Sequence, residues 1–130
     1  MNRQHVIAAL LACTLTSASY AATTICKVKS DTVSPLAVSW DTDTGLAKIQ
    51  LRYGDPVEGR LTMSRPHDDG VKVNLFFPKT DKPLSEDMEF IVFPVFKTTH
   101  RILGVSYRTI DGRRFLNASL GNFEALCNTL

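Results

Sequence analysis

The sequence lacks any long apolar run after its first 22 residues. Its most apolar later stretch, residues 88–96, contains both Glu89 and Pro94. A transmembrane helix needs about 20 consecutive, mainly apolar residues. Repeats, low-complexity tracts and abrupt changes of composition are also missing. The sequence therefore predicts no membrane span and a single domain.

An excess of charge of either sign is missing as well. The chain has 15 Lys and Arg against 13 Asp and Glu, which is a formal net charge of +2. Domains that bind nucleic acid are usually strongly basic, because they must neutralise phosphates. We therefore expect no nucleic-acid partner.

Recognisable catalytic chemistry is also lacking. The chain has no Gly-x-Ser-x-Gly elbow and no Cys-x-x-Cys pair. Residues 41–45 (DTDTG) begin like a calcium loop, but Gly45 and Arg52 stand where such a loop needs ligands, which indicates a polar turn. Residues 67–69 (HDD) also have turn composition, and a metal site there would require His100 to converge on them. We predict no enzyme, no cofactor and no metal site.

The N-terminus resembles an export signal. Arg3 precedes an apolar run at residues 6–13, and a stretch of small residues follows it. This order is typical of a cleaved secretory signal peptide. We therefore predict a leader at residues 1–21, a domain at residues 22–130 and a periplasmic or secreted location. The end of the apolar run also resembles a lipoprotein signal, so lipid anchoring at Cys13 is the alternative.

The chain has 3 cysteines, and cleavage of the leader would remove Cys13. Cys26 and Cys127 would remain, and in an oxidising compartment two cysteines have one intramolecular pairing. A metal role has little support, because no histidine lies at a ligand spacing from either cysteine. We predict a disulfide, Cys26–Cys127, that joins the two ends of the domain.

Alternation of apolar and polar residues predicts strands in three consecutive segments, residues 46–53, 57–64 and 71–77. The side chains expected to face the core are Ala47, Ile49, Leu51, Tyr53, Val57, Leu61, Met63, Val71, Val73, Leu75 and Phe77. Turn-forming residues separate the segments, as in an antiparallel meander. Residues 26–29 (CKVK) and 35–40 (PLAVSW) supply the leading strands.

A hairpin is expected near the C-terminus. Asp111-Gly112 is typical of a two-residue type I′ turn, which would join strands at residues 101–109 and 113–120. Residues 119–127 then form either a last short strand or one helical turn.

Residues 88–96 are apolar on both faces, so we expect a covered strand, bent at Pro94, that passes between two sheets. The expected fold is all-β, a single small antiparallel domain of seven to eight strands. Both a sandwich and a barrel fit this pattern, closed in either case by the disulfide between the two ends.

Arginines gather around the predicted hairpin turn. Arg108, Arg113 and Arg114 lie close to Tyr107, and Asp111 is the acid among them. In a two-residue hairpin these arginines fall on both faces. Guanidinium groups bind carboxylates and phosphates, and Tyr with Arg often anchors interfaces. We expect this cluster to bind another envelope or secreted protein or an anionic envelope component. The alternative is that these arginines keep the protein soluble and protect a sheet edge from aggregation.

These features favour a small non-enzymatic binding protein that acts through its surface. It would resemble an inhibitor or an immunity protein that neutralises another envelope protein. By analogy, a compact, disulfide-closed domain without site chemistry is typical of that class. The alternative is a carrier of a small apolar ligand, because Phe76, Phe90 and Phe93 could line a cavity.

Overall fold

The computed structural model describes residues 22–30, 34–80, 84 and 86–130. The predicted leader and Cys13 lie outside the described residues. The described chain forms eight strands and no helix. The strands are β1 (Thr23–Val28), β2 (Ala37–Asp41), β3 (Leu46–Gln50), β4 (Val57–His67), β5 (Gly70–Phe77), β6 (Asp87–Phe96), β7 (Thr99–Ile110) and β8 (Arg113–Thr129).

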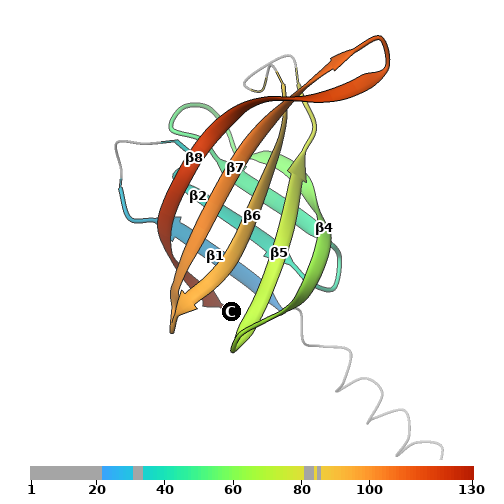
Figure 1. Cartoon of the computed structure of the whole chain (residues 1–130). Coiled ribbons are helices and arrows are strands. Elements are labelled where there is room, and N and C mark those ends of the chain that lie inside the picture. Colours follow the sequence, from blue (N-terminus) through green and yellow to red (C-terminus); the bar gives the residue numbers. More distant parts are fainter. Residues whose placement is uncertain (1–21, 31–33, 81–83, 85) are drawn as a thin grey trace, which may run out of the picture.

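The eight strands close into a single barrel (Figure 1). Each strand pairs antiparallel with the next one in sequence, and β8 pairs antiparallel with β1. The predicted all-β, antiparallel fold is confirmed, and of its two forms the barrel is the observed one. Closure removes the free edges that an open sheet of this size would leave.

The barrel interior is filled by alternate side chains of successive strands. Val73, Leu75 and Phe77 of β5 are fully buried. Phe90 and Val92 of β6 are at most 1% exposed. The core also contains Cys26, Val38, Trp40, Ala47, Ile49, Val57, Leu84, Met88, Ile102, Ala125 and Cys127. This two-residue period explains why the strands alternate apolar and polar residues in sequence.

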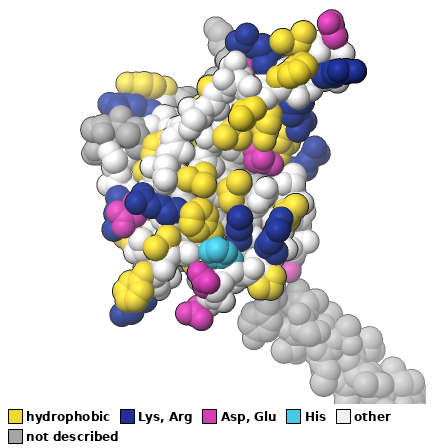
Figure 2. All heavy atoms as spheres, viewed as in Figure 1, with side chains coloured by type: hydrophobic (Ala, Val, Ile, Leu, Met, Phe, Trp, Pro, Cys, Tyr) yellow, Lys and Arg dark blue, Asp and Glu magenta, His cyan; other side chains and the backbone are white. Residues whose placement is uncertain are grey.

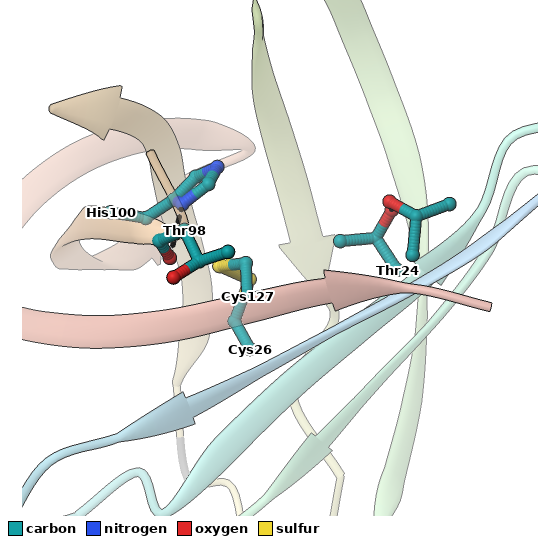
Figure 3. The surroundings of a disulfide bond; sticks show 6 residues. Thr24, Cys26, Thr98, His100 and Cys127 are labelled. Atoms are coloured by element: carbon teal, nitrogen blue, oxygen red, sulfur yellow. Dashed lines mark hydrogen bonds between the residues drawn. A yellow bond between two sulfur atoms is a disulfide. The ribbon is translucent and has the colours of Figure 1, made fainter. Parts of the chain in front are cut away.

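The predicted disulfide is present at the seam between β1 and β8. Cys26 and Cys127 are register partners, and the bridge links residues 101 positions apart (Figure 3). The backbone N–H of Cys127 donates to the Thr98 carbonyl at 2.9 Å. The same carbonyl also accepts a hydrogen bond from the Nδ1–H group of His100 at 3.0 Å. The bridge thus lies at the barrel end that carries the β6–β7 turn.

Three residues expected in the core are exposed. Tyr53 is 76% exposed because β3 ends at Gln50 and the chain turns away. Met63 is exposed because the pairing of β4 with β5 shifts between Leu61 and Met63, which reverses the side-chain alternation. Val71 is exposed beside the β4–β5 turn, at the rim of the barrel.

Two further predictions about strands need correction. Residues 88–96 do not pass between two sheets: β6 lies in the one barrel and pairs with β5 on one side and β7 on the other. Its pairing with β7 is irregular between Pro94 and Phe96, which agrees with the expected bend. Of the two forms expected for residues 119–127, the strand is the observed one, but it is the end of the long strand β8 and not a short strand of its own.

The β7–β8 hairpin extends past the rim of the barrel (Figure 1). Asp111 and Gly112 have φ angles of 51° and 76°, as the predicted turn requires. The pairing of β6 with β7 ends at Asp87–Tyr107, so β7 and β8 pair only with each other beyond that point. We call residues 107–117 the hairpin end.

Candidate functional site

The hairpin end presents two faces, which the strand register defines. Arg108 lies opposite Phe115 and Ile110 opposite Arg113, so these four side chains share one face, the inner face. The other face, the outer face, carries Tyr107, Thr109, Arg114 and Leu116. Arginine therefore occurs on both faces, as the predicted turn implied.

The outer face is fixed to the barrel wall. The Tyr107 hydroxyl donates to Glu89 Oε1 on β6 at 3.0 Å. The Arg114 guanidinium lies 4.7 Å from the ring centroid of Phe76 and 5.5 Å from that of Tyr107. Arg114 Nε also lies 3.8 Å from Asp87 Oδ2. These contacts orient the base of the hairpin end.

Phe76 is covered from outside the barrel. It lies on the opposite side of β5 from Leu75 and Phe77, yet it is only 7% exposed. Arg60 of β4 covers the ring with its guanidinium 5.6 Å from the centroid, and Arg114 supplies the second cation. The stems and planar heads of arginine suit this packing against an aromatic ring.

The environment of Tyr107 raises its pKa above the usual value. Partial burial is the largest cause, and the hydrogen bond and negative charge of Glu89 add to it, while Arg114 acts in the opposite direction. Tyr107 is therefore protonated at neutral pH and donates to Glu89. It acts within its own chain as an anchor of the hairpin end.

The inner face contacts the chain that precedes β6. Asn117 Nδ2 donates to both carboxylate oxygens of Glu86, at 2.8 and 2.7 Å. Arg108 Nε lies 3.6 Å from Glu86 Oε2. No ion pair or hydrogen bond of the Arg113 side chain occurs among the described residues, and this side chain is exposed. Arg113 is thus the arginine of the hairpin end most available to a partner.

Large apolar side chains accompany the arginines at the hairpin end. Ile110 is 51% exposed, Phe115 49% and Leu116 67%. In the space-filling view, hydrophobic and basic side chains gather together on the projecting hairpin (Figure 2). The residues predicted to bind a partner all lie in the hairpin end. Tyr107 and Arg108 belong to β7, and Arg113 and Arg114 belong to β8.

Sequence reasoning missed the apolar members of this surface and its acidic supports. Ile110, Phe115 and Leu116 looked like ordinary strand residues. The available signal was the Asp-Gly turn, because it fixes which residues pair across the hairpin and therefore share a face. Glu86 and Asp87 gave no such signal, since their contacts depend on how far β6 reaches along β7.

A pocket of about 240 Å³ lies between the hairpin end and the start of β6. Its lining consists of Lys79, Glu86, Asp87, Tyr107, Arg108 and Thr109. The mixed charges and the small volume fit one side chain of a partner better than a drug-sized ligand.

The opposite end of the barrel carries the histidines considered in the sequence. A pocket of about 360 Å³ is lined by Asp68, Asp69, Gly70, Pro94, Val95, Phe96, Lys97 and His100. His67 packs edge-on against Phe93, with ring centroids 5.6 Å apart, and its Nε2 lies 3.5 Å from Asp68 Oδ2. Over the described ranges, no group of three or more His, Cys, Asp and Glu could hold a metal ion.

The three phenylalanines considered for an apolar cavity do not share one surface. Phe90 is buried inside the barrel and packs edge-on against Phe77. Phe76 and Phe93 lie on the other side of their strands, beneath Arg114 and beside His67 respectively.

In comparisons with known proteins, the chain matches no family model, no curated protein and no solved structure. The described part of the chain includes no helix with the length and apolarity to cross a bilayer.

Proposed function

We propose that this chain is a non-enzymatic binding protein that attaches to another envelope or secreted protein through its hairpin end. One observation carries the proposal: exposed apolar and arginine side chains concentrate on an element that projects past the barrel. Ile110, Phe115 and Leu116 are each about half exposed or more. Exposed apolar patches of this kind, mixed with arginine, are typical of protein interfaces.

The internal contacts of the hairpin end support the same role. Tyr107, Arg114 and Asn117 hold its base against Glu89, Asp87 and Glu86 respectively. A surface that is held in place before binding loses less conformational entropy when a partner binds. The outermost residues are left to make contacts with another molecule.

The sequence of residues 1–21 and the Cys26–Cys127 bridge together support a periplasmic or secreted location, where disulfides persist. Transport of an apolar ligand remains the alternative prediction. The phenylalanines that would line its cavity, Phe76, Phe90 and Phe93, do not share one surface, so we prefer the binding role.

The test is affinity capture from an envelope extract with the wild-type chain and an Arg113→Glu variant. Arg113 is the suitable position because Arg114 also covers Phe76, so its replacement would disturb the barrel wall. Lys97→Glu is the matched control, because it makes the same change of charge in the exposed β6–β7 turn at the opposite end.

We expect wild type and Lys97→Glu to retain the same protein, and Arg113→Glu to lose most of it. Equal capture by all three chains, each verified as folded by its unfolding midpoint, would show that the partner binds elsewhere. Capture of nothing by any of them would remove the proposal.

A further inference from the structure

We infer that the hairpin end inserts into an acidic cleft on its protein partner; this inference rests on the proposed function. A cleft is favoured over a flat surface because binding features occur on both faces. The inner face presents Ile110, Arg113 and Phe115, and the outer face presents Leu116. A flat partner on the inner face would leave Leu116, which is 67% exposed on the outer face, in water, whereas a second wall would cover it.

The charges of the hairpin end define the chemistry of that cleft. Over residues 107–117 the charged groups are Arg108, Asp111, Arg113 and Arg114, so cations predominate. Arg108 and Arg114 each have an acid of their own chain at 3.6 and 3.8 Å, and Arg113 has none among the described residues. A guanidinium placed inside a cleft needs a carboxylate partner to offset its desolvation. The cleft therefore carries Asp or Glu on the wall that meets Arg113.

The arrangement of apolar and charged groups favours a protein over a lipid surface. A hairpin that enters a bilayer needs apolar residues at its apex and cations behind them, at the level of the headgroups. Here Asp111 occupies the turn itself, and each apolar residue of the inner face lies directly opposite an arginine. Apolar and arginine groups interleaved in this way match the centres of protein interfaces.

The test uses the full chain, expressed in the cells that produce it, with a photo-crosslinking phenylalanine analogue in place of one residue. The positions are Phe115 on the inner face, Leu116 on the outer face and, as a control, Phe96, which is 67% exposed at the other end of the barrel. Crosslinked proteins and the crosslinked residues within them are identified by mass spectrometry.

We expect positions 115 and 116 to crosslink the same protein, at residues on two facing walls with Asp or Glu beside the wall reached from position 115. No crosslink to that protein should form from position 96. With the purified partner, Arg113→Glu should raise Kd at least about tenfold, and Arg113→Lys should raise it less. Reversal of the partner carboxylate to Lys should restore binding to Arg113→Glu.

Different outcomes separate this inference from the proposed function. Crosslinks from positions 115 and 116 to a flat or uncharged protein surface would overturn the acidic cleft and leave the binding role intact. Crosslinks to lipid, or to no protein from either position, would overturn both.

Discussion

Phe76 illustrates how a single residue links the barrel to its projecting hairpin. Its ring lies outside the barrel wall but is buried, because Arg60 covers it from β4 and Arg114 covers it from β8. Arg114 also approaches Asp87, so one side chain contacts an aromatic ring and a carboxylate together. Contacts of this kind fix the direction in which the hairpin leaves the barrel.

Tyr107 provides a spectroscopic measure of the hairpin base. Burial and Glu89 raise the pKa of Tyr107 above its ordinary value of 10.0. The stability that this group contributes is therefore present at neutral pH and is lost as the pH rises through its folded pKa. We expect Glu89→Gln to lower the pKa of Tyr107, measured by phenolate absorbance in a chain whose other two tyrosines, Tyr20 and Tyr53, are replaced by Phe. An unchanged titration would show that Glu89 is not its partner.

Gly104 allows close packing between neighbouring strands. A Cβ added to Gly104 would lie 2.5 Å from the ring of Phe90, which is fully buried and opposite it in register. We expect Gly104→Ala to lower the free energy of unfolding by about 1–3 kcal/mol through overpacking. The measurement is urea denaturation.

A double-mutant cycle checks that explanation. Phe90→Leu removes the ring and should destabilise the chain by itself. Combined with Gly104→Ala, the loss should be smaller than the sum of the two single losses. Additive losses would contradict the packing argument.

At the scale of elements, the turns are specified by local chemistry. In the β2–β3 turn, Asp41 Oδ1 accepts hydrogen bonds from the backbone N–H groups of Asp43 and Thr44, at 2.8 and 3.1 Å. Residues 41–45 thus form the predicted polar turn, which the Asp41 side chain closes. The Asp111-Gly112 turn is specified in the same local way, through positive φ angles.

The Asp41 turn predicts a pH-dependent stability difference. The N–H groups of Thr44 and then Asp43 hold the pKa of Asp41 below its ordinary value of 3.8. A lowered pKa stabilises the fold above the unfolded value, and this contribution is lost as the pH falls through the folded pKa. Asp41→Asn should therefore unfold at lower urea than wild type at neutral pH.

The control for this prediction is the same pair of chains in acid. The two urea midpoints should converge once Asp41 is protonated, because neither chain then carries a charge at this position. A difference that persists unchanged in acid would assign the effect to something other than the charge.

Strands and turns were predictable from the sequence, whereas the bulge within β4 was not. Strand alternation, the turns and the hairpin depend on neighbouring residues, so they were predictable. The bulge near Met63 was not, because the hydrogen bonding of two distant segments decides it. The same limit applies to the site: the arginines were identified, but the support from Glu86 and the exposure of Phe115 depend on where the barrel wall ends.

At the scale of the molecule, two features organise the barrel. The Cys26–Cys127 bridge fixes the closing seam between β1 and β8 at one end. The hairpin end extends past the rim at the other end of β7 (Figure 1). In the proposed function, the stabilising bridge and the binding surface therefore lie at opposite ends of the β7–β8 hairpin.

The bridge links residues 101 positions apart in sequence, so its removal should destabilise the fold strongly. In the chain-entropy description, closing a loop of about 100 residues contributes up to about 4.7 kcal/mol. We expect Cys26→Ala combined with Cys127→Ala to lower the free energy of unfolding by several kcal/mol, up to about this value. Urea denaturation measures it, with the reduced wild type as the matched control. An unchanged midpoint in both would contradict the role of the bridge.

In the proposed function, the exposed side chains of the hairpin end bind the partner and the barrel does not need them to fold. Ile110, Arg113, Phe115 and Leu116 can all be replaced by Ser while Arg114 stays over Phe76 and Tyr107 stays bonded to Glu89. The decisive measurement is capture of the partner by this fourfold variant, with folding verified by its cooperative unfolding. We expect a folded chain that captures no partner, and capture at the wild-type level would contradict the binding role of the hairpin end.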